Sequence, residues 1–500
     1  MQKEKETIMR ESFKLRNEDW LERATVLELQ KAMNNGELTS MQLVSRCLEY
    51  ISRHNHKSEK LNAVLEVNPD ALQIAETLDS ERKVKGMRGL LHGIPILLKD
   101  NIETGDRMHT SAGSVALENH YAEHDATIVQ KLRNAGAVLI GKANMTEWAN
   151  FMSESMRNGY SSRGGQVLNP YGGEFDVGGS SSGSAVGVAA HFSTLSIGTE
   201  TSGSILSPAS QNNVVGIKPT VGLVSRTGII PLSHSQDTAG PIARSVTDAA
   251  ILLGSLTGLD ETDAITQTSM ERNFRDYTSF LNAKSLHSAR IGVARSMYID
   301  GLNPLQQDVI EQAIRDLEAE GASIIDLESI SPMEKDESWD YNVLLYEFKS
   351  DVDHYLKGLH PSLPVHSLSE VISFNEQHSE RTLKFGQGIL IDSDNTSGTM
   401  TEPEYLESKL RDLELSRTRG IDVVMEEHQL DALLFPNSNG AGIPAKAGYP
   451  SITVPGGFTK KGEPVGVTFT GIAYSEPALI GLAYAYEQAT KHRKAPDWKK

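Results

Sequence analysis

The sequence predicts an α/β protein built on a parallel or mixed sheet. An amphipathic helix at 125–136 ends in glycine and is followed by the apolar run AVLIGK at 137–142. The same order returns where a helix from about 303 to 320 precedes GASIID at 321–326. Helix, glycine and strand in this order are typical of crossover units on such a sheet. No Gly/Ser/Pro linker separates these units, which favours one large domain.

The N-terminal part of the chain, about the first 55 residues, is predicted to be helical. TVLELQKAMNNG stops at Asn-Asn-Gly, a signal for a helix C-terminus. A second helix is expected to start near Thr39 or Ser40, because either hydroxyl can accept bonds from the free N–H groups of the first turn. Cys47 is the only cysteine and falls at helical spacing with its apolar neighbours. It is therefore expected to be a half-buried helix residue rather than a reactive thiol.

Further strands are predicted on both sides of the chain's middle. GIPILLKD at 93–100 is a short apolar run that ends in a charge, and ARIGVA at 289–294 is a second strand. Later strand signals are DALLFP, SITVPGGF and PVGVTFTG, and a last helix is expected at about 477–490. Residues 260–290 and 329–405 are more polar and less periodic, which predicts surface excursions or a helical subdomain.

Composition excludes several classes of protein. With 500 residues, 38% of them hydrophobic, the chain is able to bury a sizeable core. A net charge of −18 repels phosphate backbones, so no nucleic-acid partner is expected. No apolar run approaches the roughly 18 residues of a membrane helix, and the charged start MQKEKE, interpreted as a solvated end, lacks a signal-peptide core. With a single cysteine, these features predict a cytoplasmic protein that does not bind a membrane.

Two glycine–serine clusters, GGSSSGS at 178–184 and TSGS at 201–204, are the main candidate for a site. A phosphate-binding loop is disfavoured, because Ser184 and Ala185 stand where Lys and Ser/Thr are required. A nucleophile elbow has the literal match G-x-S-x-G around Ser181. However, the residues before it look like a loop, and no downstream histidine has an evident catalytic context.

A serine activated by lysine is the third interpretation. Lys99 ends an apolar strand, and burial disfavours the charged form of a lysine and lowers its pKa. The residue types leave two roles open, a catalytic base or one half of a buried pair with Asp100. Likewise, ETSGS at 200–204 can form either a nest of N–H groups for an oxyanion or a glycine-rich turn where helix and strand approach closely.

DVGGSSSGSAVGVAAHFSTLSIGTETSGSILSPAS resembles the signature of the amidase-signature hydrolases. GIPILLKDNI, GKANMTEWAN and GYPSITVPGGF are similar to other segments of that family, and the likeness spans about 25–255 and 430–490. The resemblance implies a large mixed, twisted sheet with helices on both faces, and neither cofactor nor metal. It implies one domain over residues 1–500, with consecutive parts at about 1–70 (helical), 75–255 (signature core), 260–430 (variable) and 431–490 (closing strands and helix).

The family's Ser–cis-Ser–Lys triad is carried over by position. Ser204 matches the nucleophile, Ser180 matches the bridging serine in a region with a non-proline cis peptide, and Lys99 matches the base. Ser181 is expected to support the centre. The resemblance implies that the oxyanion hole is formed by the backbone N–H groups of Thr201, Ser202, Gly203 and Ser204.

The resemblance implies hydrolysis of a carboxamide to carboxylate and ammonia through an acyl-enzyme. GIKPTVGLVSRTGIIPLSHSQDTAGPIARS is closest to the branch resembling bacterial peptide amidases, which implies a peptide C-terminal amide or a small-molecule amide as substrate. A monomer or homodimer is expected. Ser202 and Leu206 depart from the glycine and arginine of many members. Two alternatives stay open, the glutaminase subunit of a tRNA-dependent amidotransferase and a non-enzymatic binding protein on this scaffold.

Overall fold

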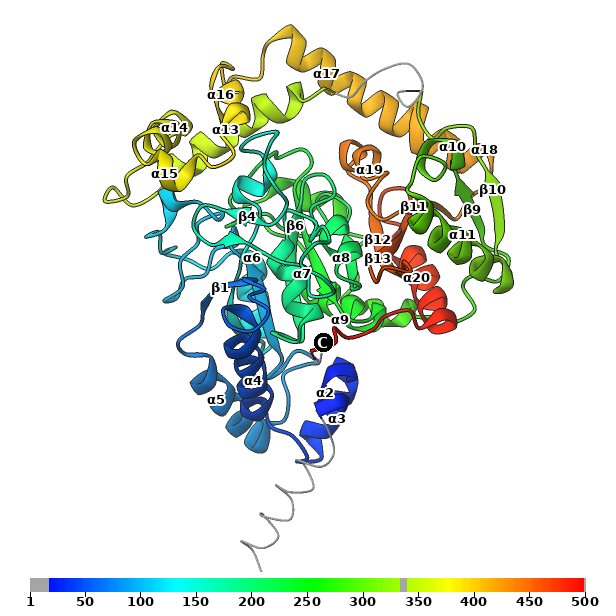
Figure 1. The fold of residues 1–500 in the computed structure, drawn as a ribbon, viewed down its shortest axis with the longest axis horizontal. Helices are drawn as coiled ribbons and strands as arrows, with labels where there is room; N and C mark the ends of the chain where they lie inside the picture. The colour runs from blue at the N-terminus through cyan, green and yellow to red at the C-terminus, as the bar shows by residue number, and fades with distance from the viewer. Residues whose placement is uncertain (1–17, 333–339, 499–500) are drawn as a thin grey trace, which may run out of the picture.

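The computed structural model describes residues 18–332 and 340–498, so the MQKEKE start lies outside the described residues. A single large sheet runs through the described chain (Figure 1). Its strand order is β1-β3-β2-β6-β8-β7-β12-β13-β11-β9-β10. Its 11 strands are β1 (Val64–Val67), β2 (Pro95–Lys99), β3 (Val138–Ala143), β6 (Leu195–Glu200), β7 (Val215–Lys218), β8 (Thr238–Ala243), β9 (Arg290–Val293), β10 (Ser323–Asp326), β11 (Ala432–Pro436), β12 (Ser451–Phe458) and β13 (Pro464–Thr470). A separate small hairpin joins β4 (Tyr160–Ser161) to β5 (Gly165–Gln166).

The sheet is mixed, as the sequence predicts. β2 is parallel to both β3 and β6, and β9 is parallel to both β10 and β11. The strands between these two groups, from β6 across β8, β7, β12 and β13 to β11, pair antiparallel. Because β2 and β6 are parallel neighbours, their carboxyl ends meet at the same edge of the sheet.

Helices cover both faces of the sheet, which confirms the predicted fold class. The helices form two groups, one on each face of the sheet. Side chains from alternate positions of the strands pack with the first group into one large core and with the second group into smaller cores. The first group is α3 (Val26–Asn34), α6 (Thr127–Asn134), α9 (Val246–Leu256), α11 (Pro304–Ala319) and α20 (Glu476–Thr490). The second is α4 (Ser40–Tyr50), α5 (Ala71–Lys85), α7 (Ser182–Ala189), α8 (Leu206–Gln211) and α19 (Gly442–Ala447).

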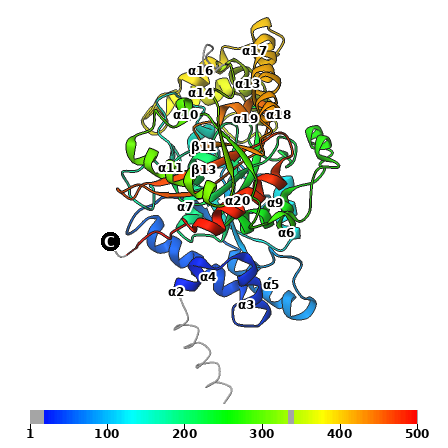
Figure 2. The same cartoon turned by 90° about the vertical axis from the view of Figure 1, so that its right-hand side faces the viewer.

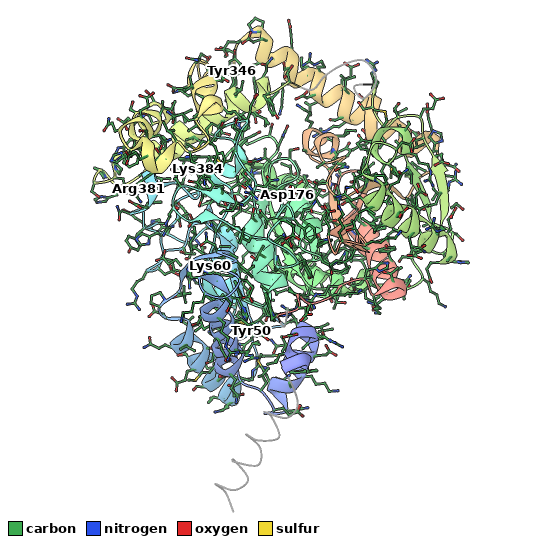
Figure 3. All side chains as sticks on the ribbon, in the orientation of Figure 1. Tyr50, Lys60, Asp176, Tyr346, Arg381 and Lys384 are labelled. Carbon is green, nitrogen blue, oxygen red and sulfur yellow. The ribbon has the colours of Figure 1, made fainter. Side chains whose placement is uncertain are left out.

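Of the two segments predicted to be surface excursions or a helical subdomain, residues 260–290 contain two short 3-10 turns, whereas the described part of 329–405 is mostly helical. It forms an arch at the end of the molecule opposite the N-terminal helices in both views (Figures 1 and 2). In Figure 3, Tyr346 lies on this arch and Tyr50, on α4, lies toward the other end. The arch consists of α13 (Asn342–Lys357), α14 (Leu368–Gln377), α15 (Ser379–Thr382), α16 (Gly388–Asp394), α17 (Pro403–Leu413), the π-helix η6 (Glu414–Ile421) and α18 (Asp422–Glu427).

Shorter helices complete the described chain. These are α2 (Glu18–Arg23), α10 (Arg295–Tyr298), the π-helix η1 (Ile51–Asn55) and the 3-10 turns η2 (Val115–Leu117), η3 (Glu147–Asn150), η4 (Ala264–Ser269) and η5 (Tyr277–Phe280). Thr39 caps α4, and Cys47 lies on the buried face of that helix, where burial raises the pKa of its thiol to about 12. The cysteine is thus more deeply buried than predicted. Among the described helices, none is long and apolar enough to cross a membrane.

Candidate active site

The site is built at the shared edge of β2 and β6. Lys99 is the last residue of β2, and Glu200 is the last residue of β6. The strand PILLK is buried along its whole length, so the Lys99 side chain is carried out of contact with water. The sheet register therefore brings a fully buried amine to the segment that follows β6.

Lys99 contacts both hydroxyl-rich regions. Its Nζ lies 2.8 Å from Ser180 Oγ, 2.8 Å from Thr199 Oγ1 and 3.0 Å from the carbonyl oxygen of Thr199. Burial lowers the pKa of Lys99 to about 7, and the carboxylates of Asp237 and Glu200 partly offset this effect. A substantial fraction of Lys99 is therefore uncharged near neutral pH and able to accept a proton.

Asp100, the other partner that the sequence leaves open for Lys99, is engaged elsewhere. Its Oδ1 lies 3.2 Å from Arg163 Nη1, and its carboxylate also accepts bonds from the Ser111 hydroxyl and the Gly113 N–H. Lys99 and Asp100 form no ion pair in the structure. This leaves the serine and threonine hydroxyls as the partners of the amine.

The two glycine–serine clusters come together around Ser181. The Ser181 N–H donates to the carbonyl of Ser204 at 3.1 Å, and the Ser181 hydroxyl donates to the carbonyl of Thr199 at 3.0 Å. The peptide bond between Gly179 and Ser180 is cis, as the resemblance implies. Gly178 is needed at its position, because a Cβ there would lie 2.6 Å from the backbone of Pro208.

The turn after β6 is held by the carboxylate of Glu200. This side chain accepts bonds from the N–H groups of Gly203, Ile205 and Leu206 at 2.7 to 3.0 Å. In the described structure, by contrast, the N–H groups of three turn residues have no hydrogen-bond partner: Thr201, Ser202 and Ser204. The Ser202 side chain is exposed, and the Ser204 hydroxyl makes no hydrogen bond to another described residue.

A cavity of about 400 Å³ adjoins this centre. Thr199 and Thr201 form its inner side, and residues Ile229–Leu232 supply an apolar wall. Asp351 and Tyr355 of α13 close it from the arch. The volume lies in the range of small-molecule sites, about 300–1,000 Å³, so a substrate side chain or short peptide segment fits beside Thr199 and Thr201.

Three residues of the site were missed by the sequence analysis. Thr199 accepts a bond from Lys99, Asn101 Nδ2 donates to Thr199 Oγ1 at 3.1 Å, and Asp237 accepts the bond of the Thr201 hydroxyl. Asn101 follows Lys99 by two residues, and Thr199 precedes Thr201 by two residues. This closeness in sequence to predicted residues is a weak indication that both belong to the site. Asp237 is brought in by the pairing of β6 with β8, which no local pattern indicates.

The nucleophile-elbow interpretation lacks its structural context. Such an elbow requires a strand that leads directly into the serine and then a helix. In the described chain, residues 167–181 form loops and turns, although α7 follows. The Ser181 hydroxyl, the nucleophile under that interpretation, is already committed to the Thr199 backbone.

Comparison with known proteins gives consistent similarities. The family model described as Amidase matches residues 46–443. A probable amidase of Arabidopsis thaliana is 43% identical over 485 residues, which cover 95% of this chain and 92% of the relative. A glutamyl-tRNA(Gln) amidotransferase component from Halorhodospira halophila is 32% identical over 95% of this chain and 99% of its own length.

Solved structures show the same similarity. Native peptide amidase from Stenotrophomonas maltophilia superposes with a TM-score of 0.89 at 43% identity, over 96% of this chain and 99% of that one. An amidase family protein from Bacillus anthracis gives a TM-score of 0.90 at 42% identity, over 95% of this chain and 92% of that one.

Proposed function

Because this chain belongs to the Amidase family and is an amide-hydrolysing enzyme, we propose that it converts a carboxamide to carboxylate and ammonia through an acyl-enzyme on Ser204. The observation that carries this proposal is the 2.8 Å hydrogen bond between the buried amine of Lys99 and the hydroxyl of Ser180. A buried, partly neutral amine next to a serine is the arrangement a histidine-free proton relay requires.

In the proposed first half-reaction, Ser204 Oγ attacks the carbonyl carbon and forms a C–O bond. The Ser204 proton passes to Ser180, whose own proton passes to Lys99 Nζ. When the tetrahedral intermediate breaks its C–N bond, Lys99 returns the proton through Ser180 to the leaving nitrogen, which departs as ammonia. Water then attacks the ester, and the same relay restores Ser204 and releases the carboxylic acid.

We assign the oxyanion to the turn after β6. The Gly203 N–H already donates to Glu200, so the donors that remain for the oxyanion are the N–H groups of Thr201, Ser202 and Ser204. Donors aimed at the developing charge stabilise the transition state by about 3–4 kcal/mol each in other serine hydrolases. The exposed Ser202 side chain adds no bulk inside this turn.

We propose a peptide C-terminal amide as the substrate class. The similarity to peptide amidase structures over nearly the whole of both chains supports this proposal. The adjoining cavity, with its apolar wall and polar arch side, suits an acyl group that carries both a side chain and a backbone. The predicted cytoplasmic location and the predicted monomeric or homodimeric state stay predictions.

The test is ammonia release from C-terminally amidated peptides and from small amides. We expect turnover by the wild type and a loss of about 10⁴-fold or more in Ser204→Ala and Lys99→Ala, since triad members act as a unit. Ser184→Ala is the matched control, because the Ser184 hydroxyl donates to Ile197 outside the centre. Full turnover by either triad variant would overturn the proposed mechanism.

The glutaminase component of an amidotransferase is the second candidate, favoured only by the 32% identity to such proteins. Leu206 is fully buried where many members have an arginine, which argues against it. Glutamine hydrolysis by the isolated chain, without hydrolysis of amidated peptides, would favour this candidate. Because this chain belongs to a family of amide-hydrolysing enzymes, the alternative of a non-enzymatic binding protein on this scaffold is not supported.

A further inference from the structure

Asp237 is a partly buried carboxylate between the proposed catalytic turn and the cavity wall. Its Oδ1 accepts the hydroxyl of Thr201 at 2.5 Å, and its Oδ2 accepts the N–H groups of Leu232 and Ser233 at 2.7 and 2.9 Å. It lines the cavity and forms no ion pair with any described residue. Three donors from two segments thus converge on one carboxylate.

The sheet explains why Asp237 meets the turn. β6 and β8 pair antiparallel up to Glu200 and Thr238. The next residue on each strand, Thr201 on one and Asp237 on the other, therefore leaves the sheet beside its counterpart, and the two side chains hydrogen-bond. This position does not depend on a flexible loop.

The turn 201–204 is held from both ends by carboxylates. Glu200 binds the N–H groups at its far end, while Asp237 binds its first residue, Thr201, through the hydroxyl. The unpaired N–H groups of Thr201, Ser202 and Ser204 belong to the stretch between these two anchors. A turn fixed only by Glu200 would leave its first N–H free to move away from the oxyanion.

We propose that Asp237 is a positioning residue of the hydrolytic centre, whose carboxylate fixes the Thr201 end of the turn and ties it to the cavity wall at residues 232–233. This inference rests on the proposed function, in which the turn supplies the oxyanion donors. Asp237 acts through Thr201 and through its charge, and it forms no bond to the reacting atoms.

The charge of Asp237 acts on the lysine. Burial raises the pKa of Asp237 to about 6, against the effect of its three hydrogen bonds, and Asp351 on α13 raises it further. Above that pH the carboxylate is ionised and raises the pKa of Lys99, as Glu200 also does. Arg226, which forms an ion pair with Asp263 at the cavity wall, is a further charged group that interacts with Asp237. Removal of the Asp237 charge therefore lowers the pKa of Lys99.

The experiment measures kcat and KM for an amidated peptide between pH 5 and 10 in the wild type, Asp237→Asn and Thr201→Val. Asp237→Asn is expected to lower kcat about 10²-fold, the scale of small misplacements in a catalytic centre, with a smaller change in KM. The acid limb of the kcat/KM profile of Asp237→Asn is expected to lie at lower pH than in the wild type, because Lys99 with a lowered pKa loses its proton at a lower pH. Thr201→Val keeps the charge, so kcat falls while the acid limb stays.

Asp248→Asn is the matched control. Asp248 is a fully buried carboxylate whose pKa burial likewise raises to about 6, and it accepts the Val26 N–H at 2.8 Å, away from the centre. Its kcat and acid limb are expected to match the wild type. A shift of the acid limb in this control would overturn the assignment of the effect to Asp237.

An unchanged kcat and acid limb in folded Asp237→Asn would overturn the proposal, even if the melting temperature falls. If Asp237→Asn does not fold, an unchanged kcat in Thr201→Val overturns it. Failure of the proposed function is distinguishable, because Ser204→Ala would then keep its activity whatever the Asp237 variants do.

Discussion

Glu200 shows how one side chain fixes the geometry of the turn that we assign to the oxyanion. It is buried, and its carboxylate satisfies three N–H groups at the start of α8. We expect Glu200→Ala to lower the free energy of unfolding by about 3–5 kcal/mol, since each unpaired buried N–H costs about 1–3 kcal/mol. Urea denaturation monitored by circular dichroism measures this change.

Glu200→Gln is the control for that prediction. Glutamine keeps the length of the side chain and one acceptor oxygen, so the loss of stability is expected to be clearly smaller than in Glu200→Ala. Equal losses in the two variants would show that packing of the side chain, and not its acceptor oxygens, stabilises the turn.

At this scale the sequence indicates part of the site. Lys99 is a candidate because a lysine ends an apolar strand, and the two glycine–serine clusters are candidates because of their composition. The choice of Ser180 and Ser204 within these clusters comes from the resemblance to the amidase-signature hydrolases. Asp237 is not recognisable, because its contact with Thr201 follows from the pairing of β6 with β8 across 36 residues of chain. The engagement of the Gly203 N–H by Glu200 is likewise a matter of side-chain reach that spacing does not reveal.

At the scale of elements, α13 is attached to the cavity wall by charged contacts. Asp351 accepts the backbone N–H of His234 at 2.8 Å and lies 2.9 Å from His234 Nδ1. Glu347 accepts the hydroxyls of Ser233 and Ser235, and it also receives Lys409 from α17 at 3.3 Å. The arch thus packs on the same wall that Asp237 connects to the turn 201–204.

This docking is expected to weaken as the pH rises. The hydrogen bond to Asp351 raises the pKa of His234 above its ordinary value. A histidine whose pKa is higher in the folded than in the unfolded protein stabilises the fold fully at a pH below its pKa in the unfolded protein. This stabilisation is lost as the pH rises through its pKa in the folded protein. Because the His234 side chain is 46% exposed, solvent screening keeps the effect small.

Hydrogen exchange of the α13 amides at pH 6 and pH 9, corrected for the intrinsic rates, measures the docking. In the wild type, the protection of the α13 amides is expected to be lower at pH 9 than at pH 6. In His234→Asn, the protection is expected to change less between these pH values. His287→Asn is the control, because His287 lies at the turn before β9, away from the arch. The same loss of protection in all three proteins would contradict the role of His234.

The strands also show what sequence patterns reveal about elements. β2, β3 and β11–β13 are short apolar runs, and each lies where its pattern predicts. β8 is not recognisable, because TAGPIA carries glycine and proline, which normally argue against a central strand. It is nevertheless a central strand, since β6 and β7 pair on either side of it. Burial on both faces outweighs the poor strand propensity there.

At the scale of the whole molecule, we expect the chain to unfold as one unit. The largest core cluster draws on residues from Ala24 to Ala322 and from Ala432 to Tyr486. The arch packs in a second cluster, which it shares with residues of 112–152 and with Ile230 and Leu232 of the same sheet-bearing part of the chain. Differential scanning calorimetry is expected to give one transition whose calorimetric and van't Hoff enthalpies agree. Two separated transitions, or an arch that melts first, would contradict the single-domain prediction.

The seam between β7 and β12 has a practical consequence. Strands β1 to β8 come from residues 64–243 and strands β9 to β13 from residues 290–470, and the two groups meet only where β7 pairs with β12. Lys99, Ser180 and Ser204 lie in the first group's part of the chain, whereas α13, the outer wall of the cavity, lies in the second. A chain divided between 259 and 288 would place the proposed catalytic residues on the first fragment and the outer wall of the cavity on the second. Ammonia release would then depend on the fragments meeting, which makes this fold a candidate for a split reporter of molecular association.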